Sequence, residues 1–510
     1  MTKTLISVPQ PSFRIHELVS QHLPHAAGRT AIVDGARAWT YQQLWDDAQI
    51  LRQQLAQAGL QAGDRLMIVG ENGAAQVLAL LAASLSDAWA AVVNARLTQA
   101  ELTQIEQHCR PRLVLYTTDV SEDALAHAQR RDLKGQEVNG LSYHCTHADE
   151  AVEAEPIHAD SAQQVAVLIY TSGSTGTPTG VMLTHRNIGY SVSVSAQARG
   201  LHQDDRIYAA LPMSHIFGLA SVVLSALGAG ASVYLTAKFE ASHAARALAG
   251  GITCFFGVPT MFVRILALSE GGNPVVAPQL RFVLCGGAPM DGALKERVES
   301  LFALPVSNGY GMTEASPTIC MMPLNQSASD LTVGYLIPGL EARIVDEEDC
   351  VVATDAVGEL KIRGPSITKG YYRAPELTAE VLSADGWFAT GDLVRQTADG
   401  RFYVMGRNKD LIIHSGFNVY PAEVEAALNA HPSVAHSCVV GRSVQDDEEV
   451  VAYVELHPQE QVSEQELKAF VKAALAPYKR PSRVILTPHL PTTQTGKILK
   501  KEVQLLASCL

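Results

Sequence analysis

The sequence lacks several features that assign a chain to a familiar class at first reading. Its eight cysteines are scattered without a CxxC pair, which argues against a disulfide framework or a zinc site and favours reduced thiols in the cytoplasm. Its formal net charge is −13, whereas non-specific binding to nucleic acid needs a basic surface. The first residues also lack the long apolar core of a signal peptide. We therefore expect a cytoplasmic protein that does not bind nucleic acid.

Long uninterrupted apolar runs are absent too. Residues 216–235 carry no charge, but Gly228 and Gly230 break the run, and a membrane span needs about twenty continuous apolar residues. We expect a buried helix, a turn and a short strand here rather than a membrane span. Because 510 residues exceed what one hydrophobic core usually holds, two or more domains are predicted.

Helical and strand patterns alternate through the first two thirds of the chain. The expected helices cover residues 40–58, 74–85, 98–108, 219–227 and 241–249, and the expected strands cover residues 65–69, 112–116, 207–211, 231–235, 254–257 and 281–285. Thr40 and Thr98 are suited to cap the helices that follow them. This alternation predicts an α/β fold with largely parallel sheets.

The pattern of expected helices and strands changes after residue 330. Short strands are expected over residues 339–345, 358–362 and 400–404, which indicates a small β-rich subdomain. A polar break at residues 407–410 precedes a compact α+β unit with helices over residues 421–429 and 464–475. We therefore predict an N-terminal domain over residues 1–406 and a C-terminal domain over residues 407–510.

Residues 170–181 read YTSGSTGTPTGV and directly follow an apolar strand pattern. Glycines let a backbone approach a ligand closely, and successive N–H groups with hydroxyls form a nest for phosphate oxygens. No lysine lies inside this loop, so the Walker pattern GxxxxGK[ST] is absent. The segment is a different kind of phosphate-binding loop.

Further polar groups follow other strand patterns. Gly286 and Gly287 come straight after a strand, where ligands bind in open α/β sheets. Glu314 stands beside a glycine turn in YGMTE and suits a Mg²⁺ ion near phosphates. Asp392 is expected in a tight TGD turn, where its carboxylate can accept hydrogen bonds from both hydroxyls of a ribose. Arg407 offers a fixed fork of donors for the ribose or a phosphate.

Taken in order, these segments resemble the adenylate-forming superfamily of acyl-CoA synthetases, peptide-synthetase adenylation domains and firefly-type luciferases. The motifs are TSGSTGTPTG, YGMTE, GELKIRGP, TGD, GRNKD and TGKILK, and the resemblance spans residues 40–501. It implies a large N-terminal domain of stacked α/β sheets with a β-rich subdomain. It also implies a small, mobile α+β C-terminal domain that turns about a hinge at Lys409.

The resemblance implies an ATP-dependent acid–CoA ligase that works with Mg²⁺, as a monomer or homodimer. The acid's carboxylate attacks the α-phosphate of ATP to give an acyl-adenylate, and the thiol of coenzyme A then displaces AMP. Two anions must approach each other in the first step, so nearby cations stabilise its transition state.

Site residues are implied position by position. The resemblance places the β- and γ-phosphates at Thr171, Ser172, Gly173, Ser174, Thr175 and Gly176, and adenine at Gly286, Gly287, Ala288 and Tyr310. It places the α-phosphate at Thr313, Mg²⁺ at Glu314, and the ribose at Asp392 and Arg407. The reacting carboxylate is implied to lie at Lys497 and His215, and the pantetheine tunnel at Gly416.

The acyl pocket is implied to lie around the segment PMSHIFG at residues 212–218. No acidic residue occurs from Leu211 to Lys238, so the acid should lack an α-amino group. The implied pocket residues are mostly apolar and favour a fatty or aryl acid over a dicarboxylate. They are Phe217, Ser221, Val222, Phe256, Gly257, Val258, Pro317 and Thr318.

One departure concerns the phosphate loop, where the superfamily usually has PKG and this chain has Thr179 between Pro178 and Gly180. We expect weaker capture of ATP, because one charge-assisted hydrogen bond is missing. Residues 415–421 and 478–481 look like those of CoA ligases and favour coenzyme A as acceptor. Loading of a carrier protein, or a non-catalytic nucleotide-binding role motivated by Thr179, stays open as an alternative.

Overall fold

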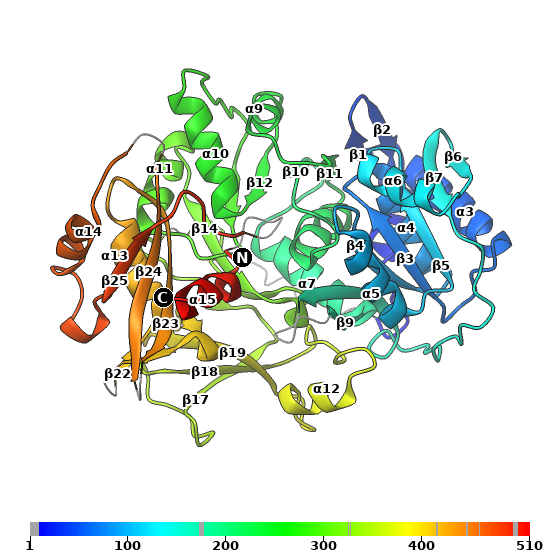
Figure 1. The fold of residues 1–510 in the computed structure, drawn as a ribbon. Helices are drawn as coiled ribbons and strands as arrows, with labels where there is room; N and C mark the ends of the chain where they lie inside the picture. The colour runs from blue at the N-terminus through cyan, green and yellow to red at the C-terminus, as the bar shows by residue number, and fades with distance from the viewer. Residues whose placement is uncertain are drawn as a thin grey trace.

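The computed structural model describes residues 10–172, 178–324, 326, 328–414, 417–444, 447–457, 460–492 and 498–510. Within these ranges the fold is α/β, with two large sheets, a small β-rich subdomain and a C-terminal α+β unit. Figure 1 shows the N-terminal elements in blue and cyan on one side and the C-terminal elements in orange and red on the other. The predicted fold class is confirmed.

A nine-stranded sheet runs through the middle of the molecule. Its central strands pair in parallel, and an antiparallel strand closes each flank. In sheet order, the strands are β16 (Tyr335–Leu336), β15 (Thr318–Met321), β14 (Val306–Gly311), β13 (Phe282–Cys285), β12 (Cys254–Gly257), β10 (Arg206–Ala209), β11 (Ser232–Leu235), β1 (Thr30–Asp34) and β2 (Arg37–Thr40).

A seven-stranded sheet lies beside it, with a parallel centre and antiparallel edges. In sheet order, its strands are β6 (Gly135–Val138), β7 (Leu141–Cys145), β5 (Leu113–Thr117), β3 (Arg65–Gly70), β4 (Trp89–Asn94), β8 (Val165–Ser172) and β9 (Pro178–Thr184).

Helix α4 (Ala74–Leu85) contacts both sheets, and almost every residue in it is buried. Small side chains such as alanine let a helix approach both sheets closely, which explains its alanine-rich sequence. The other helices of this region are α1 (Glu17–Ser20), α2 (Leu23–Ala26), α3 (Tyr41–Gln57), α5 (Gln99–Cys109), α6 (Glu122–Arg130), α7 (His185–Ala198), α8 (Ser225–Gly228), α9 (Ala241–Ala249), α10 (Pro259–Glu270) and α11 (Gly292–Phe302).

The predicted caps form as the sequence indicated. The side chains of Thr40 and Thr98 each accept a hydrogen bond from the backbone N–H three residues on. In return, the side chains of Gln43 and Glu101 accept hydrogen bonds from the backbone N–H groups of Thr40 and Thr98. These reciprocal bonds satisfy amide groups that the first turn of a helix leaves free.

Residues 216–235 fold as predicted into helix, turn and strand. The helix begins with a π-helical stretch, η1 (Phe217–Leu224), continues into α8 and is followed by β11. Among the described residues, none of the helices combines the length and the apolar character that crossing a membrane requires.

The β-rich subdomain is a four-stranded antiparallel sheet. Its strands are β17 (Glu341–Val345), β18 (Val357–Arg363), β19 (Phe388–Gln396) and β20 (Phe402–Arg407), with α12 (Pro375–Val381) between β18 and β19. The C-terminal unit holds the hairpin β21 (Ile412–His414) and β22 (Phe417–Val419) and the sheet β23 (Val434–Val444), β24 (Asp447–Leu456) and β25 (Arg483–Leu486), with α13 (Pro421–Asn429), α14 (Glu464–Val471) and α15 (Lys500–Ser508).

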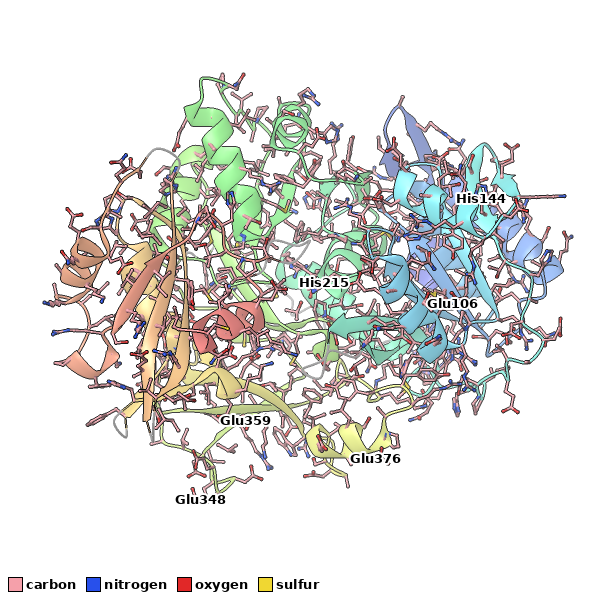
Figure 2. The ribbon with its side chains drawn as sticks, viewed as in Figure 1. Glu106, His144, His215, Glu348, Glu359 and Glu376 are labelled. Atoms are coloured by element: carbon pink, nitrogen blue, oxygen red, sulfur yellow. The ribbon has the colours of Figure 1, made fainter. Side chains whose placement is uncertain are left out.

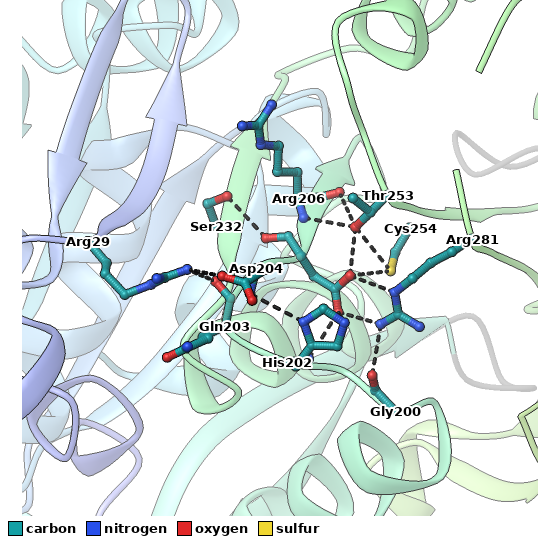
Figure 3. A network of polar contacts seen from close by, with 11 residues as sticks. Arg29, Gly200, His202, Gln203, Asp204, Arg206, Ser232, Thr253, Cys254 and Arg281 are labelled. Carbon is teal, nitrogen blue, oxygen red and sulfur yellow. Dashed lines mark hydrogen bonds and ion pairs between the residues drawn. The ribbon is translucent and has the colours of Figure 1, made fainter. Parts of the chain in front are cut away.

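A polar network joins the amino ends of the central strands (Figure 3). Asp205 accepts hydrogen bonds from Arg281 Nε (2.8 Å) and Thr253 Oγ1 (2.7 Å). Arg281 also donates to the carbonyl of Gly200 at 2.8 Å, which ties the end of α7 to the sheet. Although burial raises the pKa of Asp205, the bonds from Arg281, His202 and Thr253 lower it overall.

Candidate active site

The carboxyl ends of β12, β13 and β14 lie side by side. Gly286 N donates to the carbonyl of Gly257 at 3.1 Å. A Cβ atom at Gly286 would lie 3.4 Å from the ring of Phe217, and Gly287 has a φ of +78° in the left-handed region. Glycine is needed at Gly287 for its backbone, and at Gly286 it lets the aromatic ring pack on the chain.

Tyr310 and Asp392 are brought together from two different sheets. The Tyr310 hydroxyl donates to Asp392 Oδ2 at 2.5 Å, and Arg407 Nε lies 3.3 Å from Asp392 Oδ1. Burial, reinforced by the carboxylate of Asp392, holds the pKa of Tyr310 far above its ordinary value, so its hydroxyl stays a donor. Asp392 is buried, whereas 45% of the Arg407 side chain is exposed and open to a ligand.

The sequence prediction of a tight turn at TGD is wrong. Residues 390–392 lie inside β19, where Asp392 pairs with Arg407 across to β20. Gly391 has a φ of +69° and its N–H donates to Glu359 Oε1 at 3.2 Å, so the strand is locally irregular. Cross-strand pairing therefore sets the position of this carboxylate.

Glu314 is a buried carboxylate beside the end of β14. It lies with Thr313, which is also buried, in the single turn η2 (Thr313–Ala315). Glu314 Oε1 accepts a hydrogen bond from the Tyr371 hydroxyl at 2.9 Å. Burial raises the pKa of Glu314, because the site has withdrawn the ionised form from water. A cation beside this carboxylate would offset that cost.

These residues fit a magnesium ion. Mg²⁺ prefers oxygen ligands and is commonly held by one or two carboxylates together with phosphates of the substrate. The described residues hold no cluster of three or more metal-ligating side chains, so Glu314 would share the ion with phosphate oxygens.

His215 stands at the start of the π-helical stretch, near the centre of the molecule (Figure 2). Its ring is exposed, and Nδ1 accepts a hydrogen bond from the backbone N–H of Phe217 at 3.2 Å. In the neutral ring this bond leaves the proton on Nε2.

The implied acyl-pocket residues are all buried, and two of them, Phe217 and Val258, pack against the glycine pair. Phe217 contacts the positions of Gly286 and Gly287, and Val258 contacts that of Gly287. Pro317 O accepts from Met312 N at 2.9 Å, which holds the chain after η2 against β14. The remaining members are buried in the same region or beside it; they are Ser221, Val222, Phe256, Gly257 and Thr318.

Two polar residues beside this site were missed by sequence reasoning. Tyr371 follows the GELKIRGP segment and contacts Glu314, but it carries no motif of its own. Arg199 ends helix α7 and contacts Ser221 in the pocket wall. An isolated arginine after a helix reads as a solvated charge, so no sequence signal marked it.

The remaining predicted residues are placed only in part. Thr171 and Ser172 end β8, and Thr171 faces Thr179 across the β8–β9 hairpin. Ala288 is half-buried after β13, and Lys409 is exposed in the short turn η3 (Asn408–Asp410). The predicted residues that lie outside the described part of the chain are Gly173, Ser174, Thr175, Gly176, Gly416 and Lys497.

Cys285 is the residue directly before Gly286. It is fully buried at the end of β13, and burial raises the pKa of its thiol well above the ordinary range. All eight cysteines are free, as the scattered spacing indicated.

The chain belongs to the AMP-binding enzyme family: residues 20–372 match that family, and residues 423–497 match the AMP-binding enzyme C-terminal domain. Feruloyl-CoA synthase from Amycolatopsis sp. is 35% identical over 486 residues, which cover 94% of this chain and 96% of that relative. 4-coumarate–CoA ligase 1 from Solanum tuberosum is 31% identical over 514 residues, covering 96% and 93%.

Solved structures share the same architecture. ATP-bound MatB from Rhodopseudomonas palustris superposes with a TM-score of 0.84 at 26% identity, over 97% of this chain and 99% of that one. The resemblance drawn from the motifs is confirmed, and the protein is an enzyme with a large N-terminal domain and a smaller C-terminal one.

Proposed function

We propose that this enzyme is an ATP-dependent acid–CoA ligase that makes an acyl-adenylate and then an acyl-CoA thioester from an aryl or fatty acid. One observation carries the proposal: polar groups suited to a nucleotide meet a buried apolar wall where Phe217 packs on Gly286 and Gly287. An acid lying along that wall would have its carboxylate beside the nucleotide.

The polar groups have chemistry suited to ATP. The carboxyl oxygens of Asp392 accept from the two ribose hydroxyls, and the exposed fork of Arg407 donates to the same sugar. Tyr310 flanks adenine together with residues 286–288. Thr313 contacts the α-phosphate, and the loop of residues 171–176 binds the β- and γ-phosphates.

Glu314 holds Mg²⁺ in this proposal. The ion supplies positive charge that neutralises phosphate oxygens. The chain's own contribution is to keep the carboxylate buried, while the hydrogen bond from Tyr371 fixes its orientation. This preorganisation lowers the cost of assembling the site.

Lys497 and His215 act at the reacting carboxylate. Lys497 bridges the acid and the α-phosphate during adenylation, and His215 gates the acyl site with its Nε2 side. The second step needs a different face of the C-terminal domain, so we propose that residues 407–510 turn about Lys409 and bring Gly416 to the pantetheine tunnel.

Aryl acids are the favoured substrates. The relatives named for feruloyl-CoA and 4-coumarate support this choice, as does a wall that includes two phenylalanines and several small residues. The free, mostly buried cysteines support a reducing, cytoplasmic setting, and we keep a monomer or homodimer as the assembly.

Acid-dependent exchange of pyrophosphate into ATP, followed by analysis of the product formed with CoA, tests the function. We expect exchange and an acyl-CoA with substituted cinnamates or benzoates. Strong exchange without a thioester would favour loading of a carrier protein instead. In Lys497→Ala, adenylation should be lost while thioester formation from supplied acyl-adenylate is largely spared, and equal loss in both steps would contradict its role.

A further inference from the structure

Arg199 is a buried cation in the wall of the proposed acyl pocket. It is 2% exposed and follows directly after helix α7. Its Nη1 donates to the carbonyl of Ser221 at 3.0 Å, its Nη2 lies 3.5 Å from Ser221 Oγ, and its guanidinium lies 5.3 Å from the centre of the Phe256 ring. Ser221 and Phe256 are both implied pocket residues, so Arg199 contacts the pocket wall from two sides.

Only some of the hydrogen-bond donors of the Arg199 guanidinium have partners. Its Nε is buried without a hydrogen-bond partner among the described residues, and the bonds to Ser221 use two of its five N–H donors. In the same described part of the chain, no carboxylate forms an ion pair with it. Burial lowers the pKa of Arg199 to about 10, so it remains a cation at neutral pH.

Two other buried arginines of this fold have more complete sets of hydrogen-bond partners. Arg65, which is 1% exposed, donates from its three nitrogens to three backbone carbonyls. Arg112 pairs with the buried carboxylate of Asp64 and donates to two carbonyls. These two buried arginines thus have all their side-chain nitrogens occupied, because an uncompensated buried charge is costly. Arg199 does not follow that pattern.

Arg199 contacts the wall at Ser221 rather than at the glycine pair. Phe217 packs on Gly286 and Gly287 at the nucleotide end, and Ser221 is four residues further along the same helix. Four residues are close to one turn of this π-helical stretch, so Ser221 and its partner Arg199 lie about one turn beyond Phe217. The cation is therefore remote from the carboxylate that reacts with ATP.

A second polar pair lies on the same side. Ser195, one turn before Arg199 on α7, donates to Thr318 Oγ1 at 3.1 Å, and both side chains are buried. The position of Arg199 is also fixed from outside the pocket, because the adjacent carbonyl of Gly200 accepts a bond from Arg281. The cation is thus held in place before any ligand binds.

We propose that Arg199 binds a negatively charged oxygen at the end of the acid remote from its reacting carboxyl group. This inference rests on the proposed function and narrows its substrate class to acids with a distal carboxylate or an acidic phenol. It departs from the expectation against a dicarboxylate, because the sequence pattern did not include Arg199 in the pocket wall. The free guanidinium donors supply the hydrogen bonds, and the distal anion compensates the buried charge.

The test uses matched acids that differ only at the distal end. One series is cinnamate with a methyl, hydroxyl or carboxylate group at ring position four, and the other is octanoate against octanedioate. We expect a higher kcat/KM in thioester formation for an oxygen-bearing member than for its apolar match. The carboxylate and hydroxyl arms tell which source of oxygen the site prefers.

Variants then assign the preference to Arg199. Arg199→Met should lower kcat/KM for the preferred acid by about 10- to 100-fold, the range that a lost charged hydrogen bond gives, while its apolar match and the KM for ATP change little. Arg199→Lys keeps the charge and should retain part of the preference. Arg264→Met, at an exposed arginine of α10, is the matched control and should change nothing.

Several results would overturn the inference. One is a wild-type enzyme that prefers the apolar member of every series, and another is an Arg199→Met variant that loses activity equally with all acids. If Arg199→Met does not fold, an Arg199→Lys variant that loses activity equally with all acids would have the same meaning. Failure to form a thioester with any acid in either series would instead contradict the proposed function itself.

Discussion

The two edges of the nine-stranded sheet are built on opposite principles. At the amino edge, the carboxylate of Asp205 receives bonds from Arg281, Thr253 and the backbone of His202. At the carboxyl edge, the buried carboxylate of Glu314 carries a charge that burial disfavours, and in the pocket wall the buried guanidinium of Arg199 keeps an Nε without a hydrogen-bond partner among the described residues. The first edge stabilises the fold, whereas the second stores polar groups that a ligand would satisfy.

Substitution of Asp205 should have the largest effect on the difference between the two edges. In Asp205→Asn the partly buried Arg281 loses its counter-charge, and we expect the free energy of unfolding to fall by about 3–5 kcal/mol. Urea unfolding measures this loss. Asp204→Asn is the matched control, because Asp204 is exposed and pairs with Arg29 at the surface, where about 0–1 kcal/mol is expected. Equal losses in both variants would contradict the difference between core and surface.

Acid should remove the contribution of Asp205. Because its folded-state pKa is lowered, its stabilisation is present above the unfolded-state pKa of about 4 and is lost as pH falls through the folded-state value. The stability difference between wild type and Asp205→Asn should therefore shrink below about pH 4. A difference that stays constant down to the acid unfolding of both proteins would argue against this role.

At the other edge, neutralising an acid should affect activity and not stability. Glu314→Gln should reduce kcat for adenylation by about 10²–10³-fold, as loss of a preorganised charge does. Since its folded-state pKa is raised, ionised Glu314 is disfavoured by the fold, and the thermal midpoint should stay equal or rise. Glu376→Gln, on the exposed surface of α12, is the control. A lowered midpoint in Glu314→Gln would place Glu314 among the structural acids.

The smallest effect is expected in the phosphate loop. Thr179→Lys restores the residue common in related loops and should leave kcat unchanged while lowering the KM for ATP, by about tenfold at most. Thr179→Val separates the added charge from the lost hydroxyl. A large loss of activity in both variants would show that the Thr179 hydroxyl has a role of its own.

Local patterns predicted most of the fold. The bounds of α4, α9, α13 and β12 agree with the sequence prediction residue for residue, because apolar periodicity and terminal caps act within a few residues. Residues 390–392 were misread as a turn, since pairing between β19 and β20 overrides the local turn preference of glycine. The π-helical stretch after His215 was also not predicted.

The sequence by itself determined the family, the α/β order and the residues that we propose to bind ATP, because each depends on short contiguous motifs. Only the tertiary structure decided how Tyr310 reaches Asp392, how Tyr371 orients Glu314 and that Arg199 is buried beside Ser221 without a counter-ion among the described residues. These contacts join segments far apart in the chain, and their energies depend on burial, which a one-dimensional pattern does not record.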